Sequence, residues 1–156
     1  APQPPAATHA PPPLTANKSQ IPPPEPAPPP PRESPPEPVH VVFSTDCSGY
    51  QHWQSIAFWY ASRAAKHVGP ITRIASGCAP AEVAKIEAEW RRIDATGAFR
   101  VHAAPSTALE NGRYKYSNKP GGLLHFLTNA AIDADYVALV DPDMVMVRPL
   151  TMAVAP

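Results

Sequence analysis

Two aspartates directly follow an apolar run near the end of the chain: residues 136–140 read YVALV, and Asp141-Pro142-Asp143 comes next. In an extended segment, alternate residues lie on the same side, so Asp141 and Asp143 can present both carboxylates to one divalent cation. Hard cations such as Mg²⁺ and Mn²⁺ take oxygen ligands and leave positions open for phosphate oxygens. The pattern predicts a metal site at these two residues. The alternative is an Asp/Pro turn in which the carboxylates bond only backbone amides.

The position of this triplet relative to the expected strand separates it from a second one, Asp133-Ala134-Asp135. In an open α/β sheet, ligands bind outside the carboxyl ends of the strands. Asp141 and Asp143 follow the apolar run, whereas Asp133 and Asp135 precede it and stand at its opposite end. We therefore assign the metal site to the later pair.

The elements that would position these carboxylates alternate along the chain. Extended apolar patterns predict strands at 40–45, 71–75, 99–102 and 136–140, and helical periodicity predicts helices at about 50–67, 80–96 and 120–131. This alternation predicts a parallel sheet with helices packed on its faces. Because right-handed crossovers put all strand ends at one edge, Thr45, Asp46, Asp141 and Asp143 should gather there, with the residues after Ile74.

All three expected helices carry apolar stripes, the second one at Val83, Ile86, Trp90 and Ile93, and a long loop separates two of the expected elements. The first helix has its stripe at Trp53, Ile56, Ala57, Tyr60 and Ala64, and the third should bury Leu123, Leu124, Leu127 and Ala131. Residues 103–118 are expected to form a loop, which at this length is usually functional or mobile.

The composition divides the chain near residue 39. Residues 1–38 hold 17 of the 24 prolines and no aromatic residue, so we expect them to be disordered or polyproline II. Such a segment suits a stalk, or alternatively a proline-rich docking ligand. Residues 39–156 are enough for one core, and their 11 basic and 10 acidic residues do not suggest a nucleic-acid partner.

Cys47 and Cys78 are isolated cysteines without the paired spacing of zinc or thioredoxin sites. Each follows a predicted strand, so the two could meet at one edge of the sheet. The pattern allows either two buried thiols or, in an oxidising compartment, a disulfide.

Four ordered segments of this sequence resemble one enzyme family of plants and green algae. It comprises the peptidyl serine α-galactosyltransferases and their relatives, the hydroxyproline O-arabinosyltransferases. The segments are Phe43-Ser44-Thr45-Asp46-Cys47 with Trp53-Gln54, Gly69-Pro70-Ile71-Thr72-Arg73-Ile74, Asn118-Lys119-Pro120, and Val140-Asp141-Pro142-Asp143-Met144. The first two are closer to the galactosyltransferase branch, while the proline between the two aspartates is typical of the arabinosyltransferase branch.

The resemblance implies a Rossmann-like, nucleotide-sugar-binding half of a GT-A fold, with UDP-galactose as donor and a divalent cation, Mn²⁺, as cofactor. Asp141 and Asp143 match the metal-binding aspartates, and Asp143 is the one expected to coordinate directly. Thr45 and Asp46 fall where such folds contact the uridine. Their alternative role is ordinary capping at the end of a strand.

Two cations are candidates for binding the diphosphate. Lys119 stands near the start of a helix, where free N–H groups also favour a phosphate, and its alternative is a solvated surface lysine. Arg73 belongs to an alternating strand, which places it on the edge face or in solvent. We assign no catalytic base, because His102 and His125 are expected to be packing or surface histidines.

The resemblance also implies an acceptor and a location. Family members decorate extensin-like, hydroxyproline-rich proteins of the cell wall in the secretory pathway. We therefore expect galactose transfer to serine of such proteins in the Golgi or endoplasmic reticulum lumen, with a membrane anchor outside this chain. The alternatives are arabinose transfer to hydroxyproline and a non-catalytic, secreted, wall-associated binding module. Because family members continue with an acceptor-binding half, residues 39–156 are expected to be the N-terminal part of a truncated GT-A-like domain.

Overall fold

Nine elements occur in the residues that the computed structural model describes, 37–107 and 117–152. They are β1 (Glu37–Pro38), β2 (His40–Thr45), α1 (Gly49–Ala64), β3 (Ile71–Ser76), α2 (Pro80–Ile93), β4 (Phe99–Ala104), α3 (Asn118–Asn129), β5 (Val137–Leu139) and β6 (Thr151–Met152). The predicted alternation of strands and helices is confirmed. Residues 1–36 lie outside the described residues, so the stalk stays a prediction.

A four-stranded sheet in the order β4-β3-β2-β5 forms the centre of the fold, and its strands are all parallel. β2 pairs with β3 from Val41–Ile71 onward and with β5 as far as Val42–Leu139. The chain therefore leaves all four strands at the same edge, as the sequence predicts.

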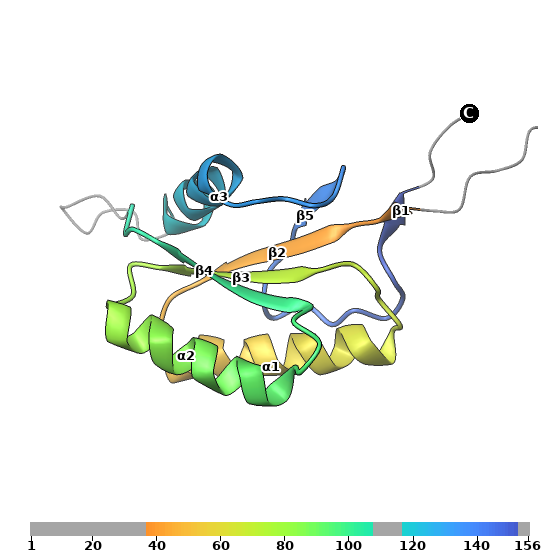
Figure 1. Ribbon diagram of the computed structural model, residues 1–156, viewed down its shortest axis with the longest axis horizontal. Coiled ribbons are helices and arrows are strands. Elements are labelled where there is room, and N and C mark those ends of the chain that lie inside the picture. Colours follow the sequence, from red (N-terminus) through yellow and green to blue (C-terminus); the bar gives the residue numbers. More distant parts are fainter. Residues whose placement is uncertain (1–36, 108–116, 153–156) are drawn as a thin grey trace, which may run out of the picture. The chain divides into compact units, whose positions relative to one another are not determined.

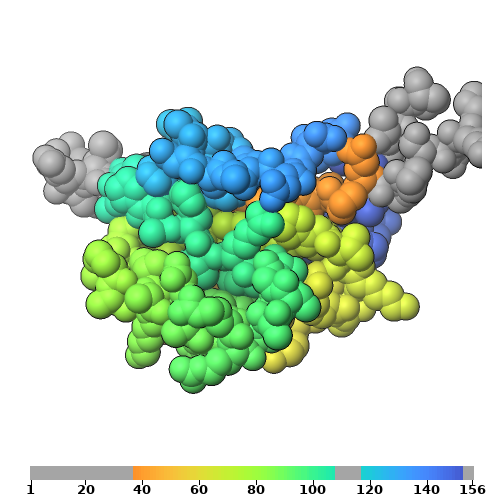
Figure 2. Space-filling model, viewed as in Figure 1, coloured from red at the N-terminus to blue at the C-terminus, as the bar shows by residue number. Residues whose placement is uncertain are grey.

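Helices cover both faces of this sheet: α1 and α2 lie on one face and α3 on the other (Figure 1). The space-filling view shows α3 and the segment leading to β5 as one layer above α2 and β4 (Figure 2). Two apolar cores result. The larger one, beneath α1 and α2, contains Val41, Phe43, Phe58, Trp59, Ile71, Ile86, Trp90, Phe99 and Met146, and the smaller one, beneath α3, contains Val42, Ile74, Ala104 and Phe126.

The predicted apolar stripe of α1 is wrong. Trp53 and Tyr60 are 54% and 60% exposed, whereas Phe58 and Trp59 are buried. Ser55 and Ser62 share the buried face, where each hydroxyl donates a hydrogen bond to a backbone carbonyl of the helix itself. The helix carries two apolar stripes. Packing selects the one whose adjacent serines are small enough for the backbone to approach the sheet.

The ends of several elements also differ from the prediction. α1 stops at Ala64 rather than at His67, because Lys66 adopts a left-handed conformation with φ of 59°. α3 begins at Asn118 and buries Phe126, while Leu124 and Leu127 are exposed. β4 extends through residues 103 and 104 of the expected loop, and 108–116 of that loop lie outside the described residues.

The strand that precedes the two aspartates is shorter and less buried than the sequence predicts. β5 spans three residues, and Leu139 is 38% exposed. Among the described strands β5 pairs only with β2, so one of its edges receives no strand partner there. The sequence also gives no sign of the antiparallel pairing of Glu37–Pro38 with Thr151–Met152. Within the described residues, none of the helices combines the length and the apolar character needed to cross a bilayer.

The buried His40 makes the stability of this fold depend on pH. Its side chain is fully buried and hydrogen-bonded to Thr72 Oγ1 at 2.8 Å. Burial, assisted by the Arg100 cation, lowers the pKa of His40 from 6.5 to about 4. As the pH falls, His40 is therefore protonated in the unfolded chain at a higher pH than in the folded protein. The stabilisation is complete above about pH 6.5 and is lost as the pH falls toward 4.

We expect the free energy of unfolding to fall by about 2 kcal/mol between about pH 7.5 and pH 4.5 from His40 alone. Urea denaturation at the two pH values measures this loss. The His40→Gln variant, which cannot titrate, should show a loss smaller by that amount. Equal pH dependence in both proteins would contradict the assignment.

Candidate functional site

A cleft of about 480 Å³ opens at the carboxyl edge of the sheet. This volume lies within the range of small-molecule sites, roughly 300 to 1,000 Å³. The ends of β2 and β5, the first turns of α1 and the start of α3 provide its walls. The lining residues are Ser44, Thr45, Asp46, Tyr50, Gln51, Gln54, Asn118, Lys119, Asp141, Pro142 and Asp143. Five of the six residues that the sequence singles out therefore come together here.

Asp141 and Asp143 reach this cleft through a turn and not through an extended segment. The carbonyl oxygen of Asp141 accepts a hydrogen bond from the Met144 amide at 3.2 Å, which closes a four-residue turn. The expected extended geometry is thus wrong, because Pro142 fixes its own φ and favours turn formation. Both side chains nevertheless line the cleft, and the Asp141 carboxylate contacts the ammonium group of Lys119.

Lys119 lies in the first turn of α3 and forms an ion pair with Asp141 across the cleft. Both side chains remain partly exposed, 40% for Lys119 and 47% for Asp141. The first N–H groups of a helix and a lysine both favour negative charge. An incoming phosphate would therefore compete with Asp141 for Lys119, and a cation would compete with Lys119 for Asp141.

Thr45 ends β2, and Asp46 directly follows it; both line the cleft. The Asp46 carboxylate accepts the Ser48 amide at 2.8 Å, and the Ser48 hydroxyl in turn accepts the Gln51 amide and caps α1. Asp46 therefore has the capping role that the sequence left as an alternative, and it also lines the cleft. Thr45 accepts a hydrogen bond from Arg73 Nε at 2.7 Å.

Arg73 is not among the residues that line the cleft, and its expected position at an edge or in solvent is wrong. All six residues of β3 are buried, and Arg73 is fully so. Burial lowers the pKa of Arg73 to about 10, an effect that the nearby Asp46 and Glu89 oppose. The guanidinium therefore stays protonated at neutral pH, and it lies behind the cleft wall in the face covered by α1.

The charges in the cleft decide which ligands it can accept. Three carboxylates, Asp46, Asp141 and Asp143, face one ammonium, Lys119, which leaves a formal charge of −2. A diphosphate would be repelled unless a cation accompanied it. Within the described residues, no three His, Cys, Asp or Glu side chains are grouped closely enough to hold a metal ion. The carboxylate pair fits a hard divalent cation that completes its shell with phosphate oxygens and water.

Several residues of the cleft were missed in the sequence. Tyr50, Gln51 and Gln54 come from the first turns of α1, where Tyr50 and Gln51 stand four and three residues before Gln54 and are therefore both its neighbours on the helix surface. Their position just after the end of β2 could have indicated that they line a ligand site, but the prediction for this helix used only its apolar residues. His102 and His125 do not line the cleft. Their ring nitrogens Nε2 and Nδ1 lie 2.9 Å apart in the interface between β4 and α3.

A disulfide between Cys47 and Cys78 joins the segments that follow β2 and β3. Of the two possibilities that the sequence allowed, two buried thiols or a disulfide, the structure has the disulfide. Because Cys47 directly follows Asp46, the bond anchors one wall of the cleft to the neighbouring strand end. It closes a loop of 31 residues.

We expect the Cys47→Ser/Cys78→Ser double variant to lose about 3 to 4 kcal/mol of unfolding free energy, because the unfolded chain regains the entropy of that loop. Urea denaturation under oxidising conditions measures the difference. Wild-type protein in excess reductant serves as the matched control and should approach the variant. No difference between the oxidised wild type and the variant would contradict the bond.

Comparisons with known proteins agree on one family. Residues 39–156 match the model of the hydroxyproline O-arabinosyltransferase family N-terminal domain. The chain is 32% identical over 127 residues to a peptidyl serine alpha-galactosyltransferase of Arabidopsis thaliana, covering 81% of this chain and 15% of that protein. It is 31% identical over 119 residues to the Chlamydomonas reinhardtii protein of the same name, covering 71% and 14%.

A third relative belongs to the other branch. The chain is 31% identical over 124 residues to hydroxyproline O-arabinosyltransferase 3 of Arabidopsis thaliana, covering 76% of this chain and 31% of the relative. The chain thus spans less than a third of the length of each of these proteins. No solved structure matches it significantly.

Proposed function

We propose that this chain forms the donor-binding part of a metal-dependent glycosyltransferase. The chain belongs to the hydroxyproline O-arabinosyltransferase family, whose N-terminal domain it matches. The observation that carries the proposal is the cleft where Asp141, Asp143 and Lys119 meet the end of β2. A parallel sheet with its ligand groups at the carboxyl edge supports a GT-A arrangement.

The roles proposed for the cleft residues follow from their charges. Asp143, which has no ion pair among the described residues, would be the main ligand for Mn²⁺, and Asp141, which pairs with Lys119, would be the second; Lys119 would bind the diphosphate. Thr45 and Asp46 contact the uridine. The Tyr50 ring, 64% exposed at the same wall, can stack on the base.

Transfer requires that negative charge be stabilised where the sugar–phosphate bond breaks. A bound Mn²⁺ supplies charge neutralisation at the departing diphosphate. Lys119 adds a second positive group from the opposite wall, together with the N–H groups of the first turn of α3. Asp141 and Asp143 orient the cation and keep it at this edge of the sheet.

The proposed donor is UDP-galactose and the proposed acceptor is serine in proline- or hydroxyproline-rich, extensin-like protein, in the Golgi or endoplasmic reticulum lumen. The names of the two galactosyltransferase relatives support this choice. Arabinose transfer to hydroxyproline is the second candidate, because the matching family model and the third relative carry that name. The disulfide agrees with an oxidising compartment.

The test uses the full-length protein with UDP-galactose, MnCl₂ and a peptide that carries serine beside hydroxyprolines. We expect Asp143→Asn to lower the transfer rate by about 100-fold or more, because a neutral amide holds the cation poorly. Removal of metal with EDTA should abolish transfer, and added Mn²⁺ should restore it. Mass spectrometry of the peptide measures the product, and UDP-arabinose with a hydroxyproline peptide tests the second candidate.

Asp135→Asn is the matched control, because Asp135 belongs to the other Asp-x-Asp triplet and precedes β5. It should leave transfer unchanged. Undiminished transfer by Asp143→Asn would refute the metal assignment. A full-length protein that binds proline-rich peptide but transfers neither sugar would instead be the wall-associated binding module.

A further inference from the structure

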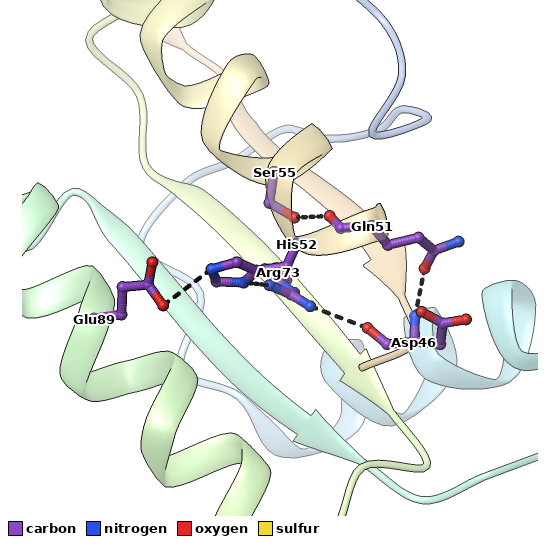
Figure 3. A network of polar contacts seen from close by, with 6 residues as sticks. All are labelled: Asp46, Gln51, His52, Ser55, Arg73 and Glu89. Atoms are coloured by element: carbon purple, nitrogen blue, oxygen red, sulfur yellow. Dashed lines mark hydrogen bonds and ion pairs between the residues drawn. The ribbon is translucent and has the colours of Figure 1, made fainter. Parts of the chain in front are cut away.

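The buried guanidinium of Arg73 lies between His52 of α1 and Asp46 at the end of β2 (Figure 3). Among the described residues, Arg73 is the largest side chain that is fully buried. Burying a guanidinium costs several kcal/mol unless its donors are satisfied. This cost suggests that the contacts of Arg73 do more than fill space.

The three contacts of Arg73 all reach one short segment. Nε donates to Thr45 Oγ1 at 2.7 Å, Nη2 donates to the Asp46 carbonyl at 3.0 Å, and Nη1 donates to His52 Nδ1 at 2.7 Å. All three acceptors belong to the segment 45–52. The same segment contains four residues that line the cleft: Thr45, Asp46, Tyr50 and Gln51. Arg73 therefore holds this wall from behind without entering the cleft.

The imidazole of His52 extends the contacts to α2. Because the guanidinium can only donate, Nδ1 of His52 must accept, and the ring proton is therefore on Nε2. Nε2 lies 3.1 Å from the Glu89 carboxylate, an electrostatic contact whose alignment is not that of a hydrogen bond. The neutral imidazole thus links the Arg73 cation to a negative charge that does not contact it directly, and Figure 3 shows the three side chains in line.

Thr45 is also held by the pairing of β2 with β3, opposite Ala75, and the side-chain hydrogen bonds within 46–51 are local. Asp46 and Ser48 bond within 46–51, at exposed positions where water competes. Beyond the end of β2, long-range restraint comes from Arg73, whose partners are 21 to 28 residues away in sequence, and from the Cys47–Cys78 bond. The disulfide fixes one point of the segment, whereas Arg73 fixes the residues on either side of it.

We propose that Arg73, His52 and Glu89 form a positioning network that holds Thr45 and Asp46 in the geometry required to bind the nucleotide of the donor. The inference rests on the proposed function and adds three residues to it, none of which touches the reacting atoms. The network acts by fixing the segment before the donor arrives, so that binding does not have to order it.

The decisive pair of variants is His52→Leu and His52→Asn in the full-length protein. Leucine removes the acceptor of Arg73 Nη1, whereas asparagine presents an oxygen near the position of Nδ1. We expect UDP in the presence of MnCl₂ to bind about 10-fold more weakly to His52→Leu, and within about 3-fold of wild type to His52→Asn. Isothermal titration calorimetry measures both.

Amide hydrogen exchange without ligand provides the second readout. In His52→Leu, amide exchange should be about 10-fold faster at residues 46–51, while the middle of α1 keeps its wild-type protection. A purely structural role would lower the melting temperature without this local change. Equal UDP affinity and equal exchange in the two His52 variants would overturn the proposal.

Glu89→Gln and Glu87→Gln give a comparison that does not depend on the folding of His52→Leu. Glu87 pairs with Arg91 on the same helix and lies outside the network. We expect UDP affinity to fall about 3-fold for Glu89→Gln and to stay at the wild-type value for Glu87→Gln. Identical affinities would refute the network. Failure of wild-type protein to bind UDP would count against the proposed function. In that case the hydrogen-exchange rates of the two His52 variants would by themselves show whether the network holds residues 46–51.

Discussion

Parallel pairing of β2 on both of its edges is the constraint on which the other features depend. His40, Val41, Val42 and Phe43 are fully buried. Val41 and Phe43 belong to the core beneath α1 and α2, and Val42 belongs to the core beneath α3. A slip of one residue would exchange these faces. It would also move Thr45 and Asp46 out of the cleft, so the two cores fix the position of the polar residues at the strand end.

The cleft and the interior behind it carry opposite charges. Carboxylates dominate the cleft, where solvent and a cation can reach them, whereas the guanidinium of Arg73 is enclosed between the sheet and α1. The nearby Asp46 carboxylate favours the charged form of this enclosed guanidinium, which stays outside the ligand space. This separation lets one strand end hold excess negative charge and still keep a fixed conformation.

Sequence reasoning worked best where chain order alone decides the outcome. The alternation of strands and helices implies parallel strands, and parallel strands bring Thr45, Asp46, Asp141 and Asp143 to one edge. It failed where a residue could face either of two environments. Arg73 could point to solvent or into the layer between the sheet and α1, and α1 could bury either of two apolar stripes. Periodicity is identical in both cases, and only the neighbouring elements distinguish them.

The sequence by itself determined the order of the elements, the edge at which the carboxylates stand and the family to which the chain belongs. These follow from local propensity and from residue identity. Only the tertiary structure decided that Asp141 pairs with Lys119, that Cys47 bonds Cys78, and that a buried arginine supports the cleft wall. These contacts join residues 22 to 31 positions apart in the chain, or residues on opposite sides of a helix–sheet interface. Their formation depends on how the two cores pack, which no local pattern in the sequence records.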